Sequence, residues 1–259
     1  MAAVVTRFSI APVRSLGLEH PDTIDLTTVG VREDRRFYLV DQDGRLVDRL
    51  VSGRLAPIGA HTDADGERLR LTFPHGNVVE DDVRLGEAVE TYVYGRTAVG
   101  HVVEGPWAVA LEPYARRWVR LVRTDRPGGT RDRAHASLVS RASVLALSAA
   151  AEVADVDARR FRMLIEIDGT AAHEEDRWVG GRIAIGDAIL RINERDARCA
   201  ITTQNPDTGE RDVDTLRTII RYRGLIPDRH GAPKAMFGVL ADIDQPGRIH
   251  LGDEVRVLD

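Results

Sequence analysis

The residue type best suited to chemistry in this chain is its single cysteine, Cys199. A thiolate is a nucleophile and a soft metal ligand, and a neighbouring cation such as Arg198 favours its formation. The hydroxyl groups of Thr202 and Thr203 follow closely and could bind a polar ligand. A lone cysteine is also often a small, buried and inert residue. Residue type alone leaves both interpretations open.

The segments on either side of Cys199 indicate how it is positioned. Residues 188–192 form an apolar run typical of a strand, and residues 205–209 (Asn-Pro-Asp-Thr-Gly) carry a turn signal. In that turn, Asp207 is suited to form an Asx-turn and Gly209 to close it. We therefore expect the thiol at or near the end of a strand, at the mouth of a turn.

Basic residues elsewhere in the chain could contact an anion. Arg14-Ser15 and residues 34–36 (Asp-Arg-Arg) are candidates, with an exposed turn and a solvated strand end as the respective alternatives. The polar segment 124–133 is either a surface loop or a lid over an anionic ligand. Three arginines within 159–162, predicted to begin a strand, favour a nearby phosphate or carboxylate because such charges are costly to leave unpaired.

Residues 173–178 superficially resemble a zinc-protease helix. The HExxH spacing would require histidine at position 177, where the chain has arginine, so that site is excluded. A solvated loop is the favoured interpretation of this segment. An acidic pair, Glu174 and Glu175, acting as general base is the alternative.

Composition limits the class of protein. The 259 residues carry a formal net charge of −5, with 43% apolar and 30% charged residues, as in a soluble globular protein. An acidic chain does not suit a duplex-binding surface, so we expect no nucleic-acid partner. One cysteine excludes an intrachain disulfide framework, a CxxC-type zinc site and an iron–sulfur cluster held by four thiolates of this chain. No segment approaches a membrane-spanning length, so we expect a cytoplasmic protein that does not bind membranes.

Short strands separated by Gly, Asp and Pro dominate the first hundred residues. Alternating segments at 4–10, 36–40, 69–73 and 89–94 predict an antiparallel β domain. Residues 108–122 read as a short helix followed by a strand. Later segments predict strands at 135–140 and 183–187 and helices at 143–153 and 214–221, with Ser140 or Ser143 capping the first helix. The predicted fold class is mainly β (α+β).

The segment around Cys199 also resembles a known family. Arg-Cys followed by Thr-Thr-x-Asn-Pro-Asp-Thr-Gly is similar to the cofactor-ligating segment of MOSC-domain proteins, the relatives of the mitochondrial amidoxime reducing component. Residues 12–15 resemble the family's Pro-Val-Lys-Ser segment with Arg14 in place of Lys, and residues 36–38 resemble its Asp-Arg-Phe-Trp-like strand start. Phe161-Arg162 matches a Phe-Arg-Pro-Asn segment, in which Met163 and Leu164 replace Pro and Asn. The Phe-Gly strand at 237–238 and the turn at 246–253 match the end of the domain.

This resemblance implies an N-terminal β-barrel-like domain over residues 1–105 and a MOSC β-barrel domain with a few peripheral helices over residues 106–259. It implies a bound molybdenum cofactor, with Cys199 as the metal ligand and catalytic residue. The residues it assigns to cofactor binding are Arg14, Ser15, Arg36, Ser137, Arg162, Arg198, Thr202 and Phe237.

The activity implied is the two-electron reduction of N-hydroxylated substrates, such as amidoximes, hydroxylamines and oximes. Electrons would come from a separate flavin, iron–sulfur or cytochrome protein. Two alternatives remain: a cofactor carrier or sulfur-transfer protein with a persulfide on Cys199, and a diverged MOSC fold without molybdenum. Leu164, where the family has Asn, keeps the last alternative open.

Overall fold

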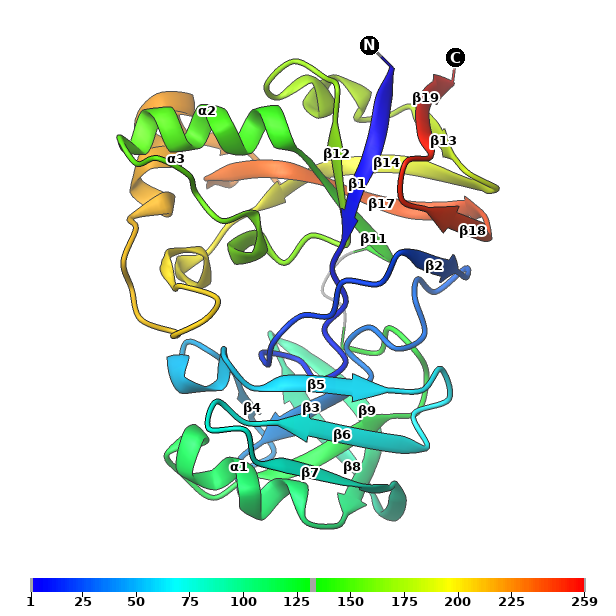
Figure 1. Cartoon of the computed structure of the whole chain (residues 1–259), viewed down its shortest axis with the longest axis vertical. Coiled ribbons are helices and arrows are strands. Elements are labelled where there is room, and N and C mark those ends of the chain that lie inside the picture. Colours follow the sequence, from blue (N-terminus) through cyan, green and yellow to red (C-terminus); the bar gives the residue numbers. More distant parts are fainter. Residues whose placement is uncertain (1, 131–133, 259) are drawn as a thin grey trace.

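The computed structural model describes residues 2–130 and 134–258, which form two β-rich lobes stacked along the long axis of the molecule (Figure 1). We call them the barrel lobe, which contains both ends of the described chain, and the sheet lobe. The predicted mainly β class is confirmed.

Seven strands close the barrel lobe, in the order β1-β12-β11-β17-β14-β13-β19. Only the β11–β12 pair is parallel among these described strands. The strands are β1 (Ala3–Phe8), β11 (Ala136–Ser140), β12 (Ile165–Asp168), β13 (Arg182–Ile185), β14 (Ala188–Ala197), β17 (Met236–Gln245) and β19 (Glu254–Leu258). Because β1 pairs with β19, the first and last strands lie side by side and complete the barrel.

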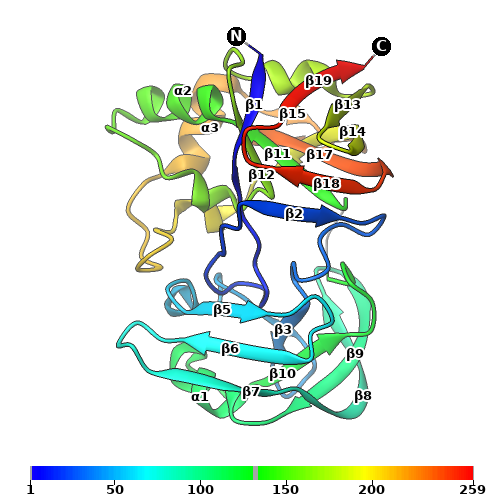
Figure 2. The ribbon, with the colours of Figure 1, turned by 45° about the vertical axis from the view of Figure 1, so that its right-hand side comes forward.

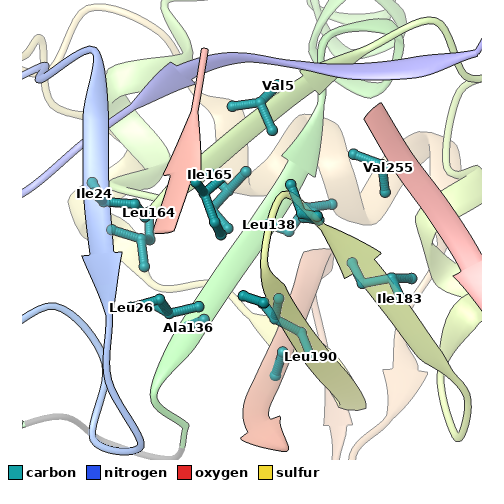
Figure 3. Packing of buried hydrophobic residues seen from close by; sticks show 14 of the residues in the cluster. Val5, Ile24, Leu26, Ala136, Leu138, Leu164, Ile165, Ile183, Leu190 and Val255 are labelled. Carbon is teal, nitrogen blue, oxygen red and sulfur yellow. The ribbon is translucent and has the colours of Figure 1, made fainter. Parts of the chain in front are cut away.

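The barrel core follows from the period of two in its strands. Leu190 and Ile192 of β14 are buried while Arg191 between them is exposed, because successive side chains of a strand point to opposite faces. Leu190 shares the barrel core with Ile183 of the adjacent strand β13 and Val255 of β19, and Figure 3 shows these side chains gathered inside the barrel. Two short strands, β2 (Thr23–Leu26) and β18 (Gly247–His250), pair beneath the barrel and add Ile24 and Leu26 to this core.

Two α-helices and two 3-10 helices support one side of the barrel lobe. Helix α2 (Arg141–Ala151) begins at Ser140, whose hydroxyl accepts a hydrogen bond from the Ser143 amide, so Ser140 is the N-cap. It lies against α3 (Thr215–Arg223), which begins at Asp214 (Figure 1). The 3-10 helices are η2 (Ala158–Phe161) and η3 (Glu174–Trp178), and the small hairpin β15 (Ile226–Pro227) and β16 (Pro233–Lys234) follows α3.

Segment 173–178 has a structural role, as the family resemblance implies for its acidic-x-Trp stretch, and is neither a solvated loop nor a cavity-facing general base. This segment contains η3, and Glu175 is fully buried, with its Oε1 accepting a hydrogen bond from the Ser143 hydroxyl at 2.7 Å. Burial raises the pKa of the Glu175 carboxyl. The acidic residue therefore fixes the start of α2 instead of facing solvent.

The sheet lobe consists of two antiparallel sheets with one helix at its base. One sheet has the order β4-β3-β10-β9-β8 and the other β5-β6-β7. Their strands are β3 (Phe37–Val40), β4 (Leu46–Val47), β5 (Gly59–Thr62), β6 (Arg68–Thr72), β7 (Val78–Asp82), β8 (Arg84–Val93), β9 (Arg96–Glu104) and β10 (Arg120–Thr124). Helix α1 (Trp107–Ala115) places the fully buried Trp107 in the core, where its indole N–H donates to the Leu69 carbonyl at 3.0 Å. Because β10 pairs with β9, this lobe continues to Thr124, and the predicted boundary after residue 105 falls inside it.

Two segments of the chain, 10–19 and 31–37, pass between the lobes (Figure 2). Ile10 and Val31 pack in the barrel core, whereas Val13 and Phe37 pack in the core of the sheet lobe. The segments also bind each other: the Phe37 amide donates to the Pro12 carbonyl at 3.0 Å and the Arg14 amide donates to the Phe37 carbonyl at 2.7 Å. Basic residues on both segments are therefore held between the lobes.

A further contact between the lobes joins η1 (Gly53–Leu55) of the sheet lobe to the turn at 205–209. A Cβ added to Gly209, whose φ is +75°, would lie 1.8 Å from the Gly53 carbonyl oxygen. We expect Gly209→Ala to lower the free energy of unfolding by more than about 2 kcal/mol, since left-handed strain and overpacking act together. Urea unfolding measures this change.

The matched control is Gly252→Ala, because Gly252 has a similar φ of +85° and no heavy atom within 4 Å of the added Cβ. Strain alone should cost this variant about 1 kcal/mol. Equal losses in the two variants would show that the Gly53–Gly209 contact does not constrain the lobes.

Candidate functional site

A cavity of about 600 Å³ lies between the lobes and contains most of the predicted site residues. The sheet lobe and the two passing segments contribute one wall, and the ends of β11, β14 and η2 contribute the other. Among the described lining residues are two aspartates, Asp34 and Asp196, and seven arginines: Arg14, Arg35, Arg49, Arg96, Arg160, Arg162 and Arg198. The cavity is thus strongly cationic, although the whole chain is acidic.

Cys199 lies where its sequence context predicts, two residues after the end of β14 and before η4 (Ala200–Thr203). Its side chain is exposed and lines the cavity, which argues against the interpretation as an inert core residue. The Thr202 hydroxyl donates to the Cys199 carbonyl at 3.0 Å and accepts from the Thr215 hydroxyl at 2.9 Å. Thr202 therefore lines the cavity while its hydroxyl fixes the backbone that carries the thiol.

The turn after Cys199 is held by Asn205 and not by Asp207. Asn205 Oδ1 accepts from the Asp207 amide at 2.8 Å, which forms the Asx-turn. The Asp207 carboxylate instead pairs with Arg159, at 2.8 and 2.7 Å. The Arg160 guanidinium pairs with Asp212 at 2.7 Å. Two of the three arginines within 159–162 therefore have carboxylates of the chain as partners, and they lie in η2 and not in a strand, which begins only at Ile165.

Arg198 lines the cavity, but its donors point into the barrel lobe. Its Nε donates to the Phe237 carbonyl at 2.8 Å and its Nη1 to the Phe161 carbonyl at 3.2 Å, while Nη1 lies 2.9 Å from Asp196. Burial lowers the pKa of Arg198, and Asp196 and the Cys199 thiolate oppose that shift. The family resemblance predicted that Arg198 contacts the cofactor. In the structure, Arg198 instead anchors the segment that carries Cys199.

Phe237 does not line the cavity. It is fully buried, stacks on Phe161 with ring centroids 4.5 Å apart, and contacts the His173 ring edge-on. Its link to the site is the backbone carbonyl that accepts from Arg198. The structure thus places Phe237 in the core behind the site instead of at the cofactor position predicted for it.

Arg14 and Ser15 come together at the point where the first passing segment turns. Arg14 Nη1 donates to the Thr130 carbonyl at 2.5 Å, and its guanidinium lies 4.7 Å from the centre of the Tyr94 ring. Ser15 lines the cavity in a left-handed conformation, with φ of +74°. The expected alternative of an exposed turn is wrong, since both residues are buried.

Arg35, and not Arg36, lines the cavity. Arg36 points to the other side of its segment, where Nη2 lies 3.4 Å from the Asp65 carbonyl and burial lowers the pKa of its guanidinium. Arg35 pairs with Asp34 and donates to the Arg162 carbonyl at 3.3 Å. Arg35 lies in the turn before β3 in a left-handed conformation, with φ of +56°, and its side chain leaves the chain in a different direction from that of Arg36. The family resemblance assigned the contact to Arg36, whereas Arg35 lines the cavity.

Arg162 carries the clearest unmet polar group of the cavity wall. Its Nη1 donates to the Leu16 carbonyl at 2.8 Å, whereas its Nη2 is buried without a hydrogen-bond partner among the described residues. Burial first, and repulsion by Arg49 and Arg35 next, hold the pKa of Arg162 well below its ordinary range. An anion in the cavity would relieve both effects.

Ser137 and Leu164 lie together in the wall. The Ser137 hydroxyl accepts from the Leu164 amide at 3.0 Å, and both residues line the cavity. Leu164 presents an apolar side chain where the resembling family has Asn, so no amide group is available at this position. Met163 packs behind it against Arg198, with the sulfur 2.5 Å from Nη2.

Several cavity residues carried no clear signal in the sequence. Arg49 follows the predicted strand at 36–40 and Tyr94 ends the predicted strand at 89–94, and both are far in the sequence from Cys199. Their role depends on the two lobes meeting. Of the possible lid at 124–133, Thr130 contacts Arg14, while Arg131, Asp132 and Arg133 lie outside the described residues.

Within the described ranges, no group of three or more His, Cys, Asp or Glu side chains could hold a metal ion. A metal at Cys199 would need most of its ligands from another molecule. No helix in the described part of the chain is long and apolar enough to cross a membrane.

Comparison with known proteins identifies the family. The MOSC domain model matches residues 125–256, and the MOSC N-terminal beta barrel domain model matches residues 2–97. The chain belongs to the MOSC family.

Individual relatives of this MOSC protein agree with that result. It is 32% identical to mitochondrial amidoxime-reducing component 1 of Mus musculus and 26% identical to the Homo sapiens protein of that name, in each case over 98% of this chain and 82% of the relative. It is also 27% identical to molybdenum cofactor sulfurase of Drosophila melanogaster, over 84% of this chain and 30% of that relative. The MOSC chain is thus a distant relative of both groups.

The stability of the core behind the site should depend on pH because of His173. Burial, with repulsion by Arg223, lowers the pKa of His173 from 6.5 to about 4, and its Nε2 bonds the Tyr222 hydroxyl at 3.0 Å. The unfolded chain therefore binds more protons at this residue between these pH values, and its contribution to stability is lost as pH falls from about 6.5 to 4.

When the pH is lowered from about 6.5 to 4, we expect the unfolding free energy of His173→Gln to fall by less than that of the wild type. Urea unfolding at several pH values measures it. His75→Gln, at an exposed turn, serves as control and should follow the wild type. Parallel curves for wild type and His173→Gln would contradict the assignment.

Proposed function

We propose that the cavity binds a molybdenum cofactor and that the protein is an oxidoreductase for N-hydroxylated substrates. The observation that carries the proposal is an exposed thiol, Cys199, in the same cationic cavity as the unpartnered Nη2 of Arg162. A pterin dithiolene cofactor has a soft metal at one end and a phosphate at the other. The donor set of this cavity fits both ends.

Specific residues would hold each end. Cys199 would supply a thiolate for the metal. The metal would obtain its other ligands from the cofactor itself, because the described residues offer no group of His, Cys, Asp or Glu side chains to complete a metal site. Arg162 and Arg14, which line the cavity together with Ser15, would bind the phosphate. When bound, the molybdenum centre supplies the two-electron redox chemistry.

The chain's own residues would orient the ligand and the substrate. Arg198 fixes the segment that carries Cys199 through the carbonyls of Phe161 and Phe237. Leu50 and Tyr94 line the cavity and remain partly exposed, so they offer apolar surface to a substrate. Reduction by two electrons also requires a separate electron-donor protein, for which a flavin, iron–sulfur or cytochrome protein is suitable.

The relatives support this function and one alternative. Amidoxime-reducing proteins match nearly the whole chain, and a molybdenum cofactor sulfurase matches over 84% of it. An exposed thiol beside Arg198 is also compatible with a persulfide, so transfer of sulfur or of the cofactor is the second candidate.

Metal content distinguishes the oxidoreductase from a sulfur-transfer protein, and the reduction assay that follows distinguishes it from a cofactor carrier. Wild type produced in a host that makes the cofactor should contain close to one molybdenum per chain, and Cys199→Ser should lose most of it because a serine hydroxyl is a poor ligand for a soft metal. Glu210→Gln, an exposed change in the same turn, is the control and should keep its metal. Elemental analysis gives the ratio.

Metal-loaded protein should then reduce benzamidoxime with a chemical electron donor, and Cys199→Ser should lose at least about tenfold in rate, equivalent to about 1.4 kcal/mol. Wild type without molybdenum would overturn the oxidoreductase proposal. A cyanide-labile sulfur on Cys199, absent from Cys199→Ser, would then favour sulfur transfer.

A further inference from the structure

We propose that Arg49 is an additional anion-binding residue of the cavity, and that Gln204 holds it in position and links it to the Cys199 segment. The inference rests on the proposed function for the identity of the anion, the phosphate monoester of a pterin cofactor. Nothing in the sequence pattern around Cys199, Arg14 or Arg162 assigns a role to Arg49.

Arg49 is a buried arginine to which the described residues offer no carboxylate partner. It is 1% exposed and lines the cavity. Its Nε donates to the Gln204 Oε1 at 3.1 Å and its Nη2 to the Asn205 carbonyl at 3.4 Å. No described residue accepts a hydrogen bond from its Nη1 or forms an ion pair with it. Neutral acceptors therefore orient the guanidinium without cancelling its charge.

The charge of Arg49 repels that of Arg162, whose Nη2 has no hydrogen-bond partner among the described residues. Arg49 is the first charged group to lower the pKa of Arg162, after burial itself. Burial, together with repulsion by Arg160, lowers the pKa of Arg49 to about 10, so it remains a cation at neutral pH. Arg160 already has Asp212 as its partner. Arg49 and Arg162 thus line the same cavity as two cations without carboxylate partners among the described residues, an arrangement that a dianionic phosphate would stabilise.

Gln204 connects this anion site with the thiol. While its Oε1 accepts from Arg49, its Nε2 donates to the Arg49 carbonyl at 2.7 Å, so the two residues are held by reciprocal hydrogen bonds. Gln204 directly follows η4, which begins after Cys199. The close approach of Gly53 and Gly209 lies beside this pair. A phosphate on Arg49 would therefore stabilise the position of the cysteine segment against the sheet lobe.

Binding of inorganic phosphate to cofactor-free protein tests the inference. Thermal unfolding is followed at pH 7 with increasing phosphate, against sodium chloride at equal ionic strength. Wild type should be stabilised by phosphate beyond the chloride effect, because a ligand that binds only the folded state raises its stability. Arg49→Met should weaken phosphate binding at least about tenfold, and Arg49→Lys less, since lysine keeps the charge but not the planar fork.

Arg54→Met is the matched control. Arg54 is an exposed arginine in η1, five residues from Arg49, and does not line the cavity. Its phosphate affinity should stay within about twofold of wild type, as expected for a surface charge. If Arg49→Met unfolds too easily to be titrated, Gln204→Leu gives the second measurement: it keeps both arginines and should still weaken phosphate binding severalfold, because Arg49 loses its orientation.

The outcomes separate this inference from the proposed function. Arg49-dependent phosphate binding in a protein that never acquires molybdenum would support the inference and overturn the oxidoreductase proposal. Stoichiometric molybdenum in wild type, together with unchanged phosphate affinity in Arg49→Met, would support the function and overturn the inference. No phosphate effect beyond that of chloride in wild type would also overturn it.

Discussion

The site depends on holding several guanidinium groups around one cavity. Burying a charge is costly unless polar groups compensate for it. Here backbone carbonyls provide most of that compensation: Thr130 accepts from Arg14, Leu16 from Arg162, Asn205 from Arg49, and Phe161 and Phe237 from Arg198. Carbonyl dipoles fix each guanidinium in direction and leave a net positive field, which suits a cavity that binds an anionic ligand.

This arrangement requires both lobes. Arg14 and Arg35 lie on segments that pass between the lobes, Arg49 lies in the sheet lobe, and Arg162 and Cys199 belong to the barrel lobe. Hydrogen bonds between the passing segments, and the tight Gly53–Gly209 contact, set the distance across the cavity. Any ligand that contacts Cys199 and Arg49 together would join the lobes, so binding and stability should be coupled.

The cavity combines an exposed thiol with a cationic wall, and Met163 and Leu164 stand where the resemblance implies Pro-Asn. Leu164 removes an amide from the wall, and Met163 packs its thioether against Arg198 behind it. The cavity wall therefore offers a ligand more charged donors and fewer neutral hydrogen-bonding groups than it would with Asn at position 164.

The sequence by itself determined the mainly β class, the strand that ends before Cys199 and the MOSC resemblance, and it limited the helix cap to Ser140 or Ser143. Period-two patterns, capping residues and turn residues act over a few neighbouring positions, which is why the sequence carries them. It also pointed to Arg14, Ser15, Ser137, Arg162 and Thr202, all of which line the cavity. Only the tertiary structure decided that Arg35 faces the cavity in place of Arg36, that Arg198 and Phe237 act behind the wall, and that Arg49 joins Gln204. Those outcomes depend on side-chain direction and on contacts between residues as far apart as Arg49 and Gln204, which local patterns cannot specify.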